Sequence, residues 1–402
     1  MASRALIAVT MFLTLVPVTL LVPGLNELVV VAHGGSTGDA HAFMTVNMLA
    51  GMVTIPLGMR LARRAADLRR WIAGALLLDA VAFAGMGLAP SLPVLYGFRV
   101  LDGAMHLPAV TLLMLASNRS SGERRGGSFG ALASAIMIGV AIGSPLGGWL
   151  VERGASAVYE VGTVLLLCAA LVALVIPPIP VRPAAQAVAR YAFDRARLQG
   201  WIPLGYAFMD RFSIGVFVST FTLFLTQVHG LSPSQRGILI ALFMLPFALL
   251  CYPAGRLADR VGWFVPMLVG NVLFGFVFAM YGYVPREWLP LAMLLSGVLS
   301  ALMFTPNLLL ISDLAARGHG EGLFGAFQVA GSLGFLGGPL VGGLLLALTR
   351  GGDMLEGYRR IFVLVGALEG GLALLAWSAL HALARELRGA PRPAVPARGV
   401  NA

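Results

Sequence analysis

The chain has 402 residues, of which 58% are hydrophobic and only 11% are charged, and it contains 50 glycines. Soluble domains carry roughly 25% charged residues, so this chain lacks the polar residues that would cover a soluble core of this size. The net charge of +10 comes entirely from arginine, because lysine is absent, and most arginines lie in short clusters between long apolar runs. This composition excludes an ordinary soluble enzyme, a nucleic-acid-binding domain and a disordered protein, and it indicates a polytopic membrane protein.

Twelve apolar runs are long enough to be read as membrane spans, each of which needs about 20 residues in a helix. They lie at 5–32, 42–59, 71–89, 93–117, 128–150, 157–176, 200–228, 237–256, 264–284, 289–312, 323–348 and 361–383. The two cysteines, Cys168 and Cys251, fall within these runs, so neither a disulfide framework nor a zinc site is expected. The predicted fold is an all-α membrane protein with twelve transmembrane helices.

The chain divides at its only sizeable internal hydrophilic interval, which contains four prolines and four arginines. We predict a six-helix half at 1–176, a cytoplasmic loop at 177–199 and a second six-helix half at 200–384. The remaining residues, 385–402, are rich in proline and are predicted to form a disordered cytoplasmic tail.

The arginines also predict the orientation of the spans, because cytoplasmic loops carry an excess of basic residues. If the N-terminus is cytoplasmic, 20 arginines fall in cytoplasmic segments and 6 in the loops on the other side. Both termini and the central loop are therefore predicted to be cytoplasmic. The expected location is a bacterial cytoplasmic (inner) membrane, which the protein would cross many times.

The two halves are repeats of each other. Residues 56–58, at the end of the second run, correspond to residues 253–255 at the end of the eighth. Residues 99–108 in the fourth run correspond to residues 297–306 in the tenth. Two six-helix halves related as parallel repeats predict a pseudo-symmetric pair of bundles, with a binding site at their interface near the middle of the membrane.

The segment after the eighth run reads Gly255-Arg-Leu-Ala-Asp259-Arg260-Val-Gly262. It resembles the GxLADRxG loop motif of the major facilitator superfamily, and the resemblance extends over essentially the whole chain. It implies a secondary transporter with alternating access, most like the twelve-span drug or metabolite:proton antiporters. The glycines are expected to permit a tight turn, and the Asp259 and Arg260 side chains are expected to hold one conformational state.

Other segments resemble motifs of the same family less closely. The first-half copy of the loop motif starts at Gly58 but has no acid at the matching position, because Asp67 comes too late. Residues 334–343, which include Pro339, are similar to the GxxxGPxxGG pattern that is associated with exporters, and the counterpart around Pro145 carries an extra residue. Small residues with a proline also suit close helix packing, so a role in export and a role in packing both remain open.

Ionisable residues inside spans cost at least about 2.5–3.5 kcal/mol each on insertion scales, so each of them indicates a function. Arg99, Asp102 and His106 share one face of the predicted fourth helix, and the first two resemble the family's RxxQG motif. Glu27 lies at a similar depth in the first run, so a contact with Arg99 or His106 is expected. In that arrangement Arg99 would set the proton affinity of a carboxylate. A self-contained Arg99–Asp102 pair that only holds helices together is the alternative.

The seventh run carries Asp210 and Arg211, and Asp210 is expected to face the cavity with Tyr206 one turn away. Asp79 and Glu369 are weaker candidates, because their spans are peripheral in the resembled fold. The amides that either line the cavity or bridge helices are Asn47, Asn307 and Gln328.

These features predict proton-coupled export of a small amphipathic or cationic compound, with proton-coupled uptake of a metabolite as the alternative. The GxxxxGK[ST] loop is absent, so the proton gradient rather than ATP is the expected driving force, and no cofactor is expected. A polytopic membrane enzyme is a remote alternative, because no Ser or Cys nucleophile accompanies Asp102 and His106 on their face. The expected partners are a small-molecule substrate, protons and the lipid bilayer, without metal or nucleic acid, and the protein is expected to be a monomer.

Overall fold

The computed structural model describes residues 2–64, 67–120, 125–178, 201–314, 322–348 and 353–389. The first bundle contains α1 (Ala2–Leu20), η1 (Asn26–Val31), α2 (Thr37–Arg64), α3 (Leu68–Gly87), α4 (Leu92–Ser120), α5 (Arg125–Val151) and α6 (Ala155–Val175). The second bundle contains α7 (Ile202–Val216), η3 (Phe217–Phe221), α8 (Thr222–Gln227), α9 (Pro233–Val261), α10 (Phe264–Met280), η4 (Arg286–Trp288), α11 (Leu289–Leu314), α12 (Gly322–Leu348), α13 (Met354–Leu375) and α14 (Trp377–Gly389).

The described helices account for the twelve predicted spans. Eight of them are long and apolar enough to cross a membrane by themselves, and three shorter apolar helices and one pair bent by 43°, α13 with α14, supply the rest. Large apolar side chains such as Leu171 and Val175 are exposed on the outside of the bundles, as expected for surfaces that face lipid. The prediction of an all-α membrane fold with twelve transmembrane helices is confirmed.

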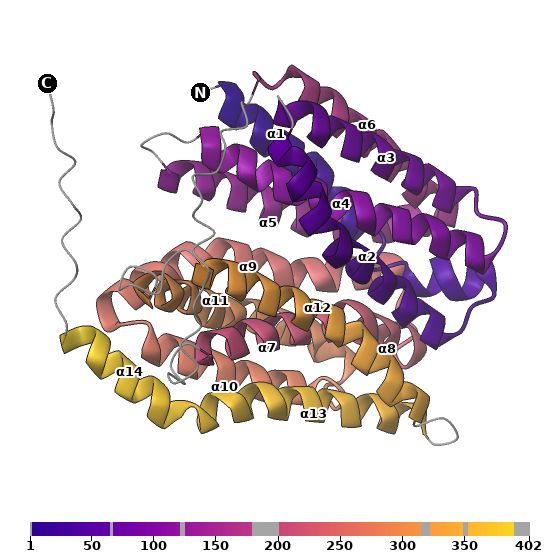
Figure 1. Cartoon of the computed structure of the whole chain (residues 1–402). Helices are drawn as coiled ribbons and strands as arrows, with labels where there is room; N and C mark the ends of the chain where they lie inside the picture. Colours follow the sequence, from indigo (N-terminus) through magenta and orange to yellow (C-terminus); the bar gives the residue numbers. More distant parts are fainter. Residues whose placement is uncertain are drawn as a thin grey trace, which may run out of the picture.

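The two bundles lie side by side, and the start of α1 and the end of α14 lie at the same end of the molecule (Figure 1). We call this the terminal end and the opposite one the closed end, because the bundles contact each other there. The predicted central loop lies outside the described residues from position 179 onward, as does the predicted tail from position 390 onward. The last helix continues to Gly389, beyond the predicted end of the second half at 384.

The first and seventh spans depart from regular α-helix near the closed end. The first span breaks after Leu20, where Pro23 and Gly24 follow, and resumes as the π-helix η1. The seventh span carries the π-helix η3 between α7 and α8. Short π-helical segments occur often at functional sites, and these two occupy corresponding helices of the repeat. Each lies beside a contact between the bundles.

Rows of glycine pack helices closely in both halves. Glycines spaced four residues apart on α5 face α1, and the corresponding glycines on α12 face α7 and η3. The α5 row is Gly139, Gly143 and Gly147, and the α12 row is Gly334, Gly338 and Gly342. Pro145 and Pro339 lie within these two helices. The motif that resembles an export signature therefore has a packing role in each half, which the repeat predicts.

Gly338→Ala is expected to destabilise the protein by about 1–3 kcal/mol, because a Cβ there would lie 2.6 Å from backbone atoms of Gly215. Gly371→Ala is the matched control, because a Cβ at that helical glycine would meet nothing within 4 Å. Thermal unfolding of both variants in the same detergent measures the difference. Equal stability of the two variants would contradict the close packing of α7 against α12.

Candidate functional site

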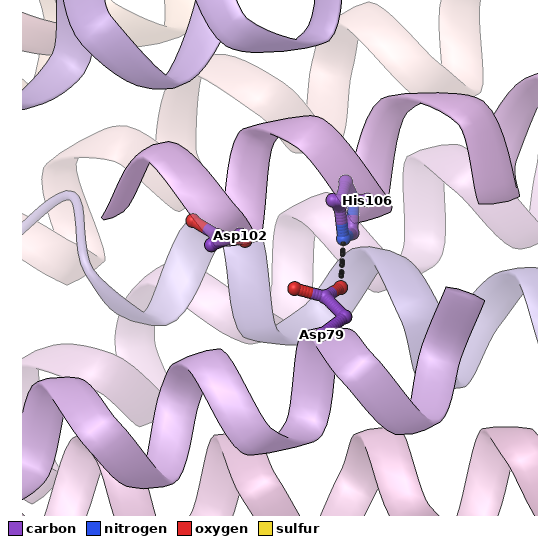
Figure 2. Close-up of side chains that lie close together, drawn as sticks. All are labelled: Asp79, Asp102 and His106. Carbon is purple, nitrogen blue, oxygen red and sulfur yellow. Dashed lines mark hydrogen bonds and ion pairs between the residues drawn. The ribbon is translucent and has the colours of Figure 1, made fainter. Parts of the chain in front are cut away.

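Three ionisable side chains of the first bundle meet between α3 and α4. Nδ1 of His106 on α4 is hydrogen-bonded to Oδ2 of Asp79 on α3 at 2.8 Å (Figure 2). Asp102 lies one turn from His106 on the same helix. One ligand-type atom from each of the three residues lies within 4.8 Å of the others.

Arg99 completes this cluster, which we call the first-half cluster (Asp79, Arg99, Asp102 and His106). Its guanidinium forms an ion pair with Asp102, donates to the backbone oxygen of Phe43 at 3.2 Å and lies over the Phe43 ring. All four members of the cluster are at most 4% exposed. The cluster is thus enclosed within the bundle.

The second helix supplies an amide to the same cluster. Asn47 of α2 donates from Nδ2 to Oδ2 of Asp102 at 2.8 Å. This contact depends on Gly103, because a Cβ there would come within 2.8 Å of Asn47 Cα, so only glycine lets α2 and α4 approach this closely. Of the two roles that the sequence left open for Asn47, the structure supports the bridging of helices.

The expected contact of Glu27 with Arg99 or His106 is not formed. Arg99 has its own partner three residues along α4, as the alternative interpretation proposed, and His106 pairs with Asp79. Glu27 lies in η1, beyond the break in the first span, and this places its carboxylate at the closed end rather than beside α4. Depth along a span therefore did not predict the partner of Glu27, because the first span breaks after Leu20 and the segment beyond the break points elsewhere.

The charges of the first-half cluster do not balance. With a neutral imidazole on His106, two carboxylates and Arg99 sum to one negative charge. An uncompensated charge is expensive inside a bundle, so one added proton makes the cluster neutral. Oδ1 of Asp79, which has no hydrogen-bond partner among the described residues, can take up that proton.

The bundles are joined at the closed end by two contacts that correspond in the repeat. Arg236 of α9 is 0% exposed and donates to Oε1 of Glu27 at 2.5 Å and to Thr226 Oγ1 at 2.6 Å. His41 of α2, at the equivalent position, lies 3.0 Å from Thr220 in η3. His41 Nδ1 donates to a backbone carbonyl, so Nε2 of the neutral ring accepts from the Thr220 hydroxyl.

Two more hydrogen bonds between the bundles lie at this end among the described residues. Gln227 donates to Thr37 Oγ1 at 2.9 Å, and the backbone N–H of Ser234 donates to Glu152 at 3.1 Å. Hydrogen bonds from Ser232 and Ser234 hold the pKa of the exposed Glu152 carboxyl below its ordinary value. Because the folded pKa is lowered, this contact is present at neutral pH and is lost as the pH falls through that lowered pKa.

Sequence reasoning missed Arg236 and His41 as functional residues. Arg236 was counted with the loop arginines, although Ser232 and Gln235 form a capping box that places Arg236 in the first turn of α9. That box is readable in the sequence. His41 carries no comparable signal, because its partner Thr220 is far away in the chain.

The seventh span buries one of its two charged residues more deeply than the other. Asp210 is 4% exposed and lies among α7, α11 and α13, beside Glu369 and Asn307. Tyr206 is buried on the same side of α7. Arg211 is the half-buried residue, with its guanidinium over Phe304 of α11. Successive helical residues point about 100° apart, and it is Asp210 that turns into the bundle. The side chain of Gln328 lies outside the described residues.

The loop motif is mostly helical. Gly255 lies within α9 and packs against Thr305, rather than forming part of a turn, and only Gly262 has a positive φ, of 90°. Asp259 and Arg260 are exposed in the last turn of α9 at the terminal end. In the first half, Gly58 packs against Pro108 of α4, close to the position that matches Thr305 in the repeat. Both glycines thus mark a close approach between corresponding pairs of helices.

Comparison with known proteins agrees with this architecture. The chain superposes on a mutant of the nucleoside transporter NupG with a TM-score of 0.77 and 14% identity, over 94% of this chain and 99% of that one. A bacterial homolog of the human lysosomal transporter Spinster, in an inward-facing and unoccupied conformation, gives 0.76 and 15%, over 97% and 98%. The human organic anion transporter MFSD10 gives 0.63 and 20%, over 94% and 98%.

These likenesses concern the fold, and a search of curated proteins finds no match. The sequence profile of the Major Facilitator Superfamily matches residues 7–211 and again residues 204–399, one match for each half. With its two repeated bundles of membrane helices, the chain belongs to the Major Facilitator Superfamily and is a multi-pass membrane transporter rather than an enzyme.

Proposed function

We propose that this transporter exchanges protons for a small amphipathic or cationic compound and exports that compound from the cell. The observation that carries the proposal is the first-half cluster, in which Asp79, Asp102, Arg99 and His106 are enclosed with a charge that one proton would neutralise. Coupling to a proton gradient requires a site inside the membrane whose charge changes when one proton binds or leaves.

The spacing of the cluster also suits a metal cation, but its charges favour a proton. Asp102 already accepts hydrogen bonds from Arg99 and Asn47 on a single oxygen. A divalent ion beside the Arg99 guanidinium would leave the buried cluster with net positive charge, whereas a proton leaves it neutral.

The arrangement of the bundles supports alternating access. The excess of arginine in the loops supports a cytoplasmic location for the terminal end. The four described hydrogen bonds between bundles then lie on the outer side, and the bundles separate toward the cytoplasm (Figure 1). Release of these contacts, with closure near Asp259 and Arg260, would expose the interface to the other side.

The balance of buried charges favours a cationic substrate. Among the described residues four acids are buried, which are Asp79, Asp102, Asp210 and Glu369, against two buried arginines, which are Arg99 and Arg236. Without added protons these side chains carry an excess of negative charge. A cation that arrives as protons leave would keep the interior balanced.

The test uses the purified protein in proteoliposomes with an imposed pH gradient and a panel of labelled cationic, amphipathic and metabolite compounds. We expect proton-driven movement of a compound against the proton flux, which a protonophore abolishes. Asp79→Asn should abolish this driven transport and leave counterflow exchange, whereas Glu160→Gln, at an exposed acid of α6, should change neither. Movement in the same direction as protons would replace export with uptake, and transport driven by sodium without a pH gradient would contradict proton coupling.

A further inference from the structure

We infer that the second bundle contains a proton-binding site of its own, formed by Asp210 of α7 and Glu369 of α13. We call it the second-half pair. The inference rests on the proposed function and extends it, because a site in each half implies two protons for each transport cycle instead of one.

The geometry of the pair favours a bound proton. Asp210 and Glu369 are 4% and 1% exposed, and Oδ1 of Asp210 and Oε1 of Glu369 have no hydrogen-bond partner among the described residues. Ser213, three residues after Asp210 on α7, donates from Oγ to Oε2 of Glu369 at 2.6 Å, so both acids lie at one place in the bundle. Without an added proton, two negative charges would share this buried site.

Two further polar side chains point to a site that binds and releases its ligand. The Tyr206 hydroxyl and both amide atoms of Asn307 have no hydrogen-bond partner among the described residues, although these residues are only 0% and 1% exposed. Both lie close to the pair: the charges of Asp210 and Glu369 act on Tyr206, and Asn307 approaches Asp210. Buried polar groups without partners are rare. Here the Tyr206 hydroxyl and Nδ2 of Asn307 are donors that can stabilise a carboxylate once the proton has left.

Without an added proton, the second-half pair and its neighbouring arginine have the same net charge as the first-half cluster. Among the described residues, the titratable groups that act on the pair are Tyr206 and Arg211 of α7, while α11 contributes the neutral Asn307. Two carboxylates and Arg211 carry one negative charge, which a single proton neutralises. The first-half cluster likewise contains two acids and one arginine, on α3 and α4. The acids occupy different helices in the two halves, so this shared sum does not follow from the repeat.

Infrared spectroscopy of the full-length protein in lipid nanodiscs tests the inference without a substrate. The C=O band of protonated carboxyl groups is recorded across roughly pH 5 to 9. We expect the wild-type band to contain two carboxyl groups, and Glu369→Gln to halve its area because Asp210 then ionises beside Arg211. Asp79→Asn should remove the other half. Glu356→Gln, at a partly exposed acid of α13 that pairs with Arg360, is the matched control and should leave the band unchanged.

A band whose area is unchanged by Glu369→Gln overturns the second site, whether or not Asp79→Asn reduces it. A reduction by Asp79→Asn alone would leave the proposed function standing with one proton, whereas no effect of either change would remove the basis of both. Ser213→Ala covers the case in which Glu369→Gln does not fold, because it keeps both acids and deletes only the bond to Glu369. It should shift the frequency of half of the band at constant area, and an unshifted band would overturn the inference.

Discussion

Arg99→Gln is expected to lower the free energy of unfolding by about 3–5 kcal/mol, the usual cost of removing one partner of a buried ion pair. The loss arises because Asp102 stays enclosed with Asp79 nearby and without the guanidinium that compensates its charge. The same change removes four contacts of the arginine, to Asp102, to the Phe43 backbone, to the Phe43 ring and to the Met44 sulfur. Thermal unfolding of wild type and variant in one detergent measures the difference.

The pH dependence has a defined sign. At acid pH Asp102 can take up a proton and become neutral, so the destabilisation by Arg99→Gln should be smaller at about pH 5 than at about pH 8. The double variant Arg99→Gln/Asp102→Asn is the matched control, because it removes both charges together. It should regain most of the lost stability but should not regain proton-driven transport. A single variant that is as stable as wild type at every pH would mean that Arg99 and Asp102 are not a buried pair.

Glu27→Gln is expected to destabilise the present state by about 1.4 kcal/mol relative to the state in which the bundles separate at the closed end. This free energy corresponds to about a tenfold shift of the equilibrium toward the second state. The change leaves Arg236 buried and without its carboxylate, and opening relieves this cost by admitting water. We expect no more than this modest shift, because the Glu27 side chain is 26% exposed and solvent already screens part of the pair.

Labelling of a single cysteine measures this shift. With Cys168 and Cys251 replaced by alanine, Ser144→Cys places the probe on α5 at a buried position where Gly237 of α9 packs against it. Maleimide should react about tenfold faster in the Glu27→Gln background, in proportion to the open population. Glu27→Gln/Arg236→Gln removes both charges and should return the rate toward that of wild type. A wild-type rate in the single variant would show that the ion pair does not stabilise closure.

The sequence alone determined the membrane class, the number of spans and the repeat. Long apolar runs in a chain without lysine leave no soluble alternative, and a run of about 20 apolar residues has one stable form in lipid, because a helix satisfies its own backbone hydrogen bonds. The sequence alone also predicted those contacts of the candidate site that lie within a single helix. Arg99 and Asp102 are three residues apart on one helix, so their pairing needs no knowledge of other helices.

The tertiary structure decided which distant residues meet. Asp79 was a weak candidate because its span is peripheral, yet the packing of α3 against α4 places it beside His106. Glu27 was assigned to Arg99 by depth, whereas the break after Leu20 carries it to Arg236. Such pairings depend on the rotation of each helix about its axis and on where a helix breaks. The rotation of a helix and the position of a break are set by packing between helices, as at Gly103. A run of apolar residues does not specify either of them by itself.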